Sequence, residues 1–207
     1  MRARFLSVVA AALAAVVVAA AVPAVASALP KWHKHTLTFR DSSAYTLQVL
    51  AAIGWINDSP ARITLKPAKR GHTADITFRD VNKHTTWDGR ASGYRSSRGR
   101  YRVTISLNHY YFDKPEYYPV DWMKAEVITH ELGHALGLNH RKGCSIMIAK
   151  GLPNECRGVE GDPVNVRCGP FRADIEALIR LYGGKISTYD AYRCVPANAP
   201  QPPLPAG

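Results

Sequence analysis

Four short segments in the first half of the chain alternate apolar and polar residues, the pattern of a half-buried β-strand. They cover residues 34–41, 62–66, 74–79 and 101–107. Between the third and the fourth, residues 80–102 are rich in glycine, serine, threonine and arginine, which predicts a long loop with room for one edge strand.

Three further segments carry apolar residues at helical spacing. The first can be capped by Ser42 or Ser43 and should end near Asn57, before Pro60. The second can be capped by Asp121 and runs through residue 134, and the third covers residues 171–182. A strand, a helix, further strands and then another helix form a series that is common in α/β sheets.

Residues 108–119 are unusually aromatic, with Tyr110, Tyr111, Phe112, Tyr117 and Tyr118. Two interpretations stay open for this segment. The rings could form the walls of a substrate cleft, or they could pack into the core beneath a loop.

The N-terminal residues 1–28 have the form of a secretory signal peptide. Arg2 and Arg4 precede a long run of alanine and valine, and Ala26-Ser27-Ala28 has the small-x-small form of a cleavage site. A membrane anchor over residues 5–22 is the alternative. We expect a secreted mature chain that begins at Leu29, with one folded domain over residues 29–194 and a proline-rich disordered tail over residues 195–207.

The chain of 207 residues is basic, with 27 Lys and Arg against 16 Asp and Glu. Without Arg2 and Arg4, 25 basic residues remain against 16 acidic ones, a net charge of +9. Such a surface could favour acidic substrates, cell-wall polymers or anionic membranes. The charges are scattered along the chain, however, which favours solvated loops and strand edges as their explanation. We expect no nucleic-acid partner, no membrane insertion after signal cleavage, and a monomer.

All four cysteines, Cys144, Cys156, Cys168 and Cys194, lie in the last third of the chain. An even number in an exported protein predicts two disulfides. Three pairings are possible, and closeness in sequence favours Cys144 with Cys156 and Cys168 with Cys194.

The segment from residue 130 to 140 carries the chemistry of the chain. On a helix, His130 and His134 project from the same face, where one Zn²⁺ can take both imidazoles. Glu131 stands beside that face, placed to hold a water molecule. Gly137 allows a left-handed exit from the helix, and the turn brings back His140 as a third ligand. Three protein ligands leave one open position, as in catalytic zinc sites.

These residues resemble the His-Glu-x-x-His-x-x-Gly-x-x-His motif of the metzincin zinc peptidases. The resemblance implies an α+β fold that has a twisted, mostly parallel sheet with two long helices, then a methionine turn at Met147 and a C-terminal helix. It also implies that His130, His134 and His140 bind one catalytic Zn²⁺ and that Glu131 is the general base. Asp174 would lie beneath the methionine turn, or else on a helix surface.

Within the metzincins, the zinc ligands and the last helix are similar to matrixins, whereas the compact exported form and Cys144-Ser145 before Met147 are similar to snapalysins. Snapalysins have aspartate at the position of His140. Ala149 stands where astacins and serralysins carry a tyrosine. A second zinc at His72, Asp75, His84 or His109 lacks the matrixin ligand spacing, and Ca²⁺ is possible without a recognisable ligand pattern.

We therefore expect a secreted zinc metalloendopeptidase of broad preference that acts on proteins or peptides. Two alternatives stay open: a secreted zinc-containing binding protein without catalysis, and a zinc amidase that acts on a cell-wall linkage. The presence of Glu131 speaks against the first, because a purely structural zinc has no use for a base.

Overall fold

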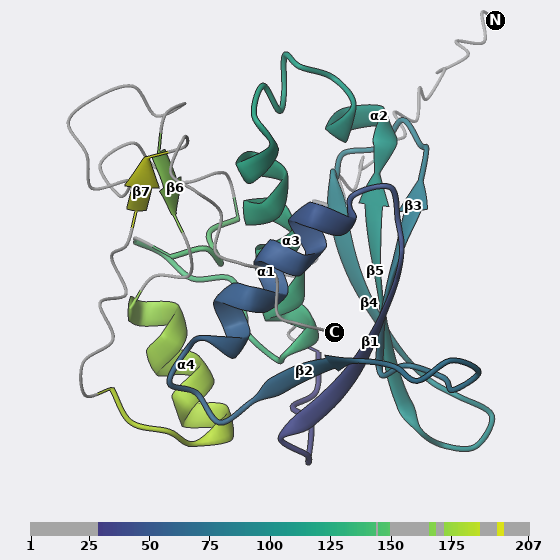
Figure 1. Ribbon diagram of the computed structural model, residues 1–207, viewed down its shortest axis with the longest axis vertical. Helices are drawn as coiled ribbons and strands as arrows, with labels where there is room; N and C mark the ends of the chain where they lie inside the picture. Colours follow the sequence, from purple (N-terminus) through teal and green to yellow (C-terminus); the bar gives the residue numbers. More distant parts are fainter. Residues whose placement is uncertain (1–28, 144, 150–165, 169–171, 187–193, 197–207) are drawn as a thin grey trace, which may run out of the picture.

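The computed structural model describes residues 29–143, 145–149, 166–168, 172–186 and 194–196 (Figure 1). In chain order, the elements are β1 (Thr36–Ser42), α1 (Thr46–Asn57), β2 (Thr64–Pro67), β3 (Ile76–Val81), β4 (Gly89–Arg95), β5 (Tyr101–Asn108), α2 (His109–Phe112), α3 (Asp121–Ala135), β6 (Val166–Cys168), α4 (Arg172–Tyr182) and β7 (Cys194–Pro196).

The main sheet has the strand order β2-β1-β3-β5-β4. The first four strands in this order pair in parallel, and β4 joins β5 antiparallel at one edge. With the two long helices α1 and α3 and the C-terminal helix α4, this arrangement confirms the predicted α+β fold. The long loop expected over residues 80–102 contains the edge strand β4.

Helices α1 and α3 contact each other and cover one face of the sheet (Figure 1). The strands supply every second residue to this face because side chains alternate along a strand. The buried cluster joins Leu37, Phe78 and Ile105 of the sheet to Ile53 of α1 and Leu132 of α3. This packing fixes the position of α3, which carries the histidine motif.

Both predicted helix caps were wrong. Helix α1 begins at Thr46, and the Ser43 hydroxyl accepts from Tyr45 N at 3.2 Å, which forms a turn ahead of the helix. Asp121 is the first residue of α3 and its side chain makes no cap bond. It instead accepts from Lys124 Nζ at 3.1 Å, a pair at i and i+3 on the helix surface.

The structure supports the packing interpretation for part of the aromatic segment. Phe112 is 1% exposed and packs in the core, with the Tyr118 ring 5.0 Å away. Tyr117 is 49% exposed. The segment thus serves first as packing, and Tyr118 is the member that also reaches towards β4, as described below.

The predicted signal peptide, Cys144, Cys156 and residues 197–207 of the predicted tail lie outside the described residues, whereas residues 195–196 of that tail belong to strand β7. Strands β6 and β7 pair antiparallel, with Cys168 opposite Cys194. Opposed residues of such a pair have Cα atoms about 4.5–5.5 Å apart, within the range that a disulfide spans. The disulfides themselves stay a prediction. Across the described part of the chain, the helices are too short or too polar to span a bilayer.

Candidate metal centre

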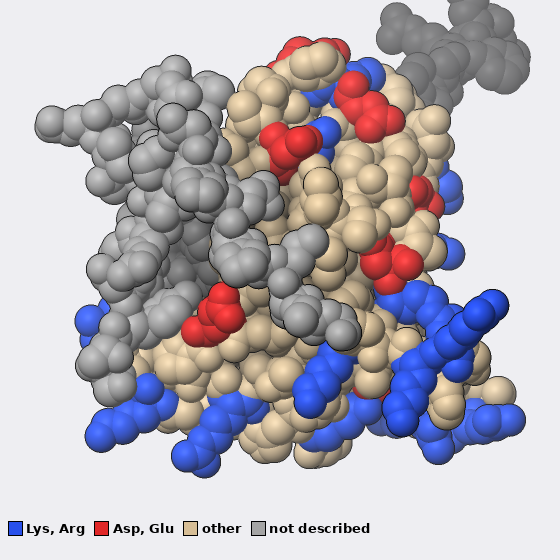
Figure 2. Space-filling model, viewed as in Figure 1, with Lys and Arg blue, Asp and Glu red and all other residues tan. Residues whose placement is uncertain are grey.

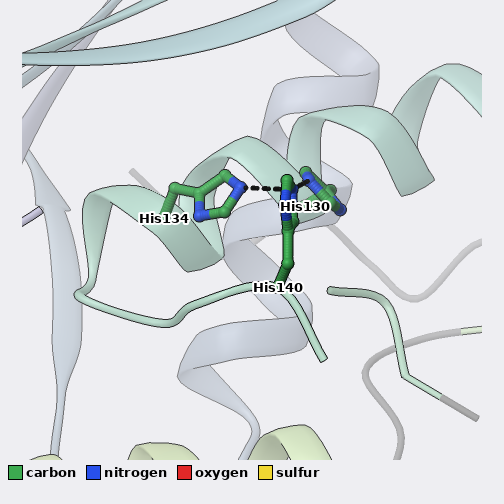
Figure 3. Close-up of side chains that lie close together, drawn as sticks. All are labelled: His130, His134 and His140. Atoms are coloured by element: carbon green, nitrogen blue, oxygen red, sulfur yellow. Dashed lines mark hydrogen bonds between the residues drawn. The ribbon is translucent and has the colours of Figure 1, made fainter. Parts of the chain in front are cut away.

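Three imidazoles meet at the C-terminal end of α3 (Figure 3). His130 and His134 lie one turn apart on the helix, and His140 arrives from the segment that follows it. The Nε2 atom of His140 lies 3.2 Å from that of His130 and 3.1 Å from that of His134. A tetrahedral zinc with bonds of about 2.0–2.1 Å would separate its nitrogen ligands by roughly 3.3–3.4 Å. The spacing therefore suits a metal ion.

The other ring nitrogens fix which atoms face the centre. His130 Nδ1 lies 2.7 Å from the Ile146 carbonyl oxygen, and His134 Nδ1 lies 2.9 Å from that of Leu138. A carbonyl oxygen only accepts, so each Nδ1 carries a proton and each neutral ring directs its Nε2 lone pair inward. A single proton on His140 Nε2 could satisfy one of these lone pairs but not both. A cation satisfies all three, so the residues present fit a bound metal.

Burial reinforces the neutral form of these rings. Loss of solvent lowers the pKa of His130 to about 4, although its hydrogen bond to Ile146 acts in the opposite direction. Burial also lowers the pKa of His134. Both imidazoles are thus neutral near pH 7, the form that binds metal.

The turn that returns His140 is built at the end of α3. Leu138 N donates to the Gly133 carbonyl and Gly137 N to that of His134, both at 2.9 Å, which is a Schellman motif. Gly137 has φ +93°, a left-handed conformation that confirms the predicted role of this glycine. The Tyr182 hydroxyl donates to the Leu136 carbonyl at 2.7 Å, and Trp32 Nε1 donates to that of Ala135. The turn is therefore held by α4 and by the segment before β1.

Glu131 lies beside the triad and is 8% exposed. Its Oε2 accepts from Ala91 N of strand β4 at 2.6 Å. Burial raises the pKa of this carboxyl to about 7, and the Ala91 hydrogen bond opposes the rise. A carboxylate with a pKa near 7 can both take up and release a proton under neutral conditions.

Met147 lies beneath the triad in a turn that Asp174 supports. The Asp174 carboxylate, 1% exposed, accepts from the Ser145 hydroxyl and, at 2.8 Å, from Ile146 N. The Ser145 hydroxyl in turn accepts from Met147 N at 2.9 Å. This geometry confirms that Asp174 lies under the turn rather than on the helix surface. Since the Ile146 carbonyl also holds His130, the turn links Asp174 to the metal site.

Asn108 organises the loop that leads to β4, and sequence reasoning missed it. This fully buried side chain donates to the carbonyls of Lys83 at 2.8 Å and Trp87 at 3.0 Å and accepts from Lys83 N at 3.1 Å. Just beyond the loop, the Asp88 carboxylate accepts from the Tyr118 hydroxyl. An asparagine at a strand end carries no pattern that reveals such a role, because its partners are backbone groups of a distant loop.

Residues considered for a second metal serve other contacts. Asp75 is 3% exposed and pairs with Lys34 and Arg102, each at 2.7 Å. His109 contacts Asp113 at 2.9 Å and Asp80 at 3.2 Å. Within the described part of the chain, the three histidines of the motif are the single group whose ligand atoms cluster for a metal.

Comparison with models of known protein families finds a match that covers the metal centre. The family model described as "dual-action HEIGH metallo-peptidase" matches residues 25–160. The chain belongs to this family. The five letters of its name correspond to residues 130–134, with Leu132 in place of isoleucine. Membership confirms the expected class of zinc metallopeptidase. No curated protein matches the chain.

Solved structures that match the chain include three proteins at low identity. Myroilysin is 20% identical over 53% of this chain and 52% of its own, with a TM-score of 0.37. High choriolytic enzyme 1, a hatching-enzyme zinc protease from Oryzias latipes, is 18% identical over 77% of this chain and 100% of its own, with a TM-score of 0.44. The ECX AB5 holotoxin is 18% identical over 73% of this chain and 82% of its own, with a TM-score of 0.42. This chain thus spans about half of the myroilysin chain.

Proposed function

We propose that this protein is a secreted zinc-dependent endopeptidase in which His130, His134 and His140 hold one zinc ion and Glu131 is the general base. The observation that carries the proposal is the convergence of three Nε2 atoms beside a buried carboxylate. The two Nδ1 hydrogen bonds to carbonyl groups support it, because they orient the rings before metal binds.

Zinc bound by the triad would lower the pKa of a coordinated water towards about 7 and would polarise the scissile carbonyl. Glu131 then takes a proton from the attacking water and passes it to the leaving amine. The Ala91 N–H fixes one carboxylate oxygen of Glu131, so the carboxylate keeps its orientation during both transfers. Burial excludes bulk water from the same group and raises its affinity for the proton.

The edge strand β4 is the proposed support for the substrate backbone. Its inner side pairs with β5, whereas Ala91 N on the outer side is directed to Glu131. An extended peptide that adds to this outer edge would therefore pass next to the base. Recognition through backbone hydrogen bonds agrees with a broad preference for side chains.

Secretion is part of the proposal and rests on the sequence of residues 1–28, with its basic start, apolar run and small-residue cleavage site. Export is consistent with the predicted disulfides.

The test compares the secreted wild-type protein with Glu131→Gln for bound zinc and for cleavage of unfolded casein. Glutamine keeps the acceptor for Ala91 N but cannot take up the proton. We expect one zinc in each protein and cleavage by the wild type alone. Zinc in both without cleavage by either would refute the peptidase proposal and favour a binding protein or a cell-wall amidase.

A further inference from the structure

The face of the main sheet that the helices do not cover has an uneven distribution of charge. Side chains alternate along each strand, so Arg40, Lys66, Arg79 and Arg90 all project from this open face, and all four are exposed. The two acidic residues of the five strands, Asp41 and Asp80, have the opposite parity and face the helices. These four exposed cations therefore share the open face. Asp75, just before β3, also reaches this face, where it is buried and paired with Lys34 and Arg102, whereas Arg95 of β4 has the opposite parity.

Strand register places the four cations in a diagonal row. Thr38 of β1 is opposite Lys66 of β2, Arg40 lies two residues further on, and Arg79 of β3 is opposite Ser42. Arg79 and Arg90 are both opposite Ser106, one on either side of β5. With strands about 4.8 Å apart and about 3.3 Å per residue, neighbouring Cα atoms in the row lie roughly 8–10 Å apart.

These four side chains are available to a partner. None of them forms an ion pair with another described residue. Arg40 donates to the His72 carbonyl at 2.6 Å and Arg79 to the Ser106 hydroxyl at 3.3 Å, which orients two guanidinium groups without neutralising them. Lys69 and Arg70, also exposed, extend the positive charge beyond the end of β2. In the view of Figure 2, Lys and Arg side chains gather along the lower edge of the molecule, and most of the Asp and Glu side chains lie above them.

The side chains between the cations indicate the kind of partner. They are small hydroxyl residues. The hydroxyls of Thr77, Ser92 and Thr104 can bind sugar hydroxyls, whereas Thr38, Ser42 and Ser106 use theirs in hydrogen bonds within the protein. Tyr94 is the one large exposed hydrophobic residue of the five strands. A bilayer surface needs an apolar face to insert, and single-stranded nucleic acid needs several aromatic rings for base stacking. The open face offers neither.

We propose that the open face of the sheet, through Lys66, Arg40, Arg79 and Arg90, binds a linear anionic polysaccharide. Guanidinium groups pair with sulfate, phosphate or carboxylate substituents, and the hydroxyl residues contact the sugar units. The row lies on the face of the sheet opposite α3, and its last member, Arg90, adjoins Ala91, whose N–H binds Glu131. Binding at this face would hold the protein on an anionic matrix.

The test measures binding of fluorescent dextran sulfate, with uncharged dextran as the neutral probe, by anisotropy at several salt concentrations. The variant Lys66→Gln/Arg79→Gln removes two positive charges from the row, and Arg180→Gln/Lys185→Gln removes two exposed charges in and just after α4. We expect dextran sulfate alone to bind, about tenfold more weakly to the row variant and within about twofold of wild type for the α4 variant.

Equal weakening in both variants would show attraction by net charge alone and would overturn the proposal, as would binding of uncharged dextran. Tighter binding of single-stranded DNA or of anionic vesicles than of dextran sulfate would also overturn it, since the face would then serve another class of partner. Far-ultraviolet circular dichroism of each variant establishes that the fold is retained, so a loss of binding reports on the face itself.

Discussion

Gly133 of α3 lies directly against the sulfur of Met147, so closely that the site leaves no room for a Cβ atom on residue 133. The glycine inside the motif is therefore explained by packing rather than by backbone conformation. Met147 is fully buried there and forms the apolar floor beneath the triad.

Gly133→Ala should destabilise the protein although alanine favours helices. The added methyl group must displace Met147, and overpacking of this kind costs about 1–3 kcal/mol, more than the gain of about 0.5–1 kcal/mol in helix propensity. Urea unfolding measures the change. Gly54→Ala in α1, where a Cβ meets nothing within 4 Å, is the matched control and should stabilise. Stabilisation by both substitutions would contradict the packing account.

Asp174→Asn should weaken zinc binding without any change to a ligand. Asp174 holds the Ile146 backbone, whose carbonyl orients His130, so its substitution loosens a support of the first ligand. Loss of such a support lowers metal affinity by about 10–100-fold. Competition with a chromophoric zinc chelator measures the affinity. Glu176→Gln removes a carboxylate from the surface of the same helix, where it pairs with Arg172, and should leave zinc affinity as it is.

Asp75→Asn should remove part of the pH dependence of stability. Burial alone would raise the pKa of Asp75, but hydrogen bonds from Lys34 and Thr38 outweigh it and hold the pKa below its ordinary value of 3.8. A lowered folded-state pKa contributes stability above the unfolded-state value, and this contribution is lost as pH falls through the folded-state value.

Breaking the buried pair with Arg102 should cost about 3 kcal/mol or more at pH 7. The difference between wild type and variant should shrink as the pH falls below 3.8, as measured by urea midpoints from pH 7 to pH 2. A difference that stays constant over this range would show that the charge of Asp75 is irrelevant to stability.

Asn108→Ala should lower catalysis as well as stability. Loss of its hydrogen bonds to Lys83 and Trp87 leaves buried backbone groups without partners, which lowers the free energy of unfolding by about 1–3 kcal/mol. The same loss frees the loop that positions β4 beside Glu131. We expect kcat/KM for casein to fall while zinc affinity is unchanged. Asn57→Ala, which removes a similar bridge to Leu65 away from the site, should cost stability and leave kcat/KM intact.

Most of the fold could be predicted from the sequence because apolar residues recur at regular spacing in its strands and helices. Alternation placed β1, β2, β3 and β5 within two residues of their observed starts, and helical spacing placed α4 within one. The caps failed for a physical reason: Ser43 and Asp121 each have a local partner that competes with the helix end. Strand β4 was predicted only as one possibility within a long loop, because glycine and serine weaken the alternation of apolar and polar residues in this edge strand.

The three motif histidines could be found from spacing alone because the helix and the glycine turn dictate where they converge. The supports of the site could not. Ala91 and Asn108 act through hydrogen bonds between segments far apart in the chain, and side-chain type gives no sign of such partners. Asp174 was expected through family resemblance, and its burial under the methionine turn decided between the two interpretations.

The central claim is that three imidazoles and no sulfur bind the zinc ion. X-ray absorption at the zinc edge of the purified protein tests it most directly. The account predicts three nitrogen ligands at about 2.0–2.1 Å and one further light atom. A sulfur ligand at about 2.3 Å, or a nitrogen count unchanged in His140→Ala, would contradict it.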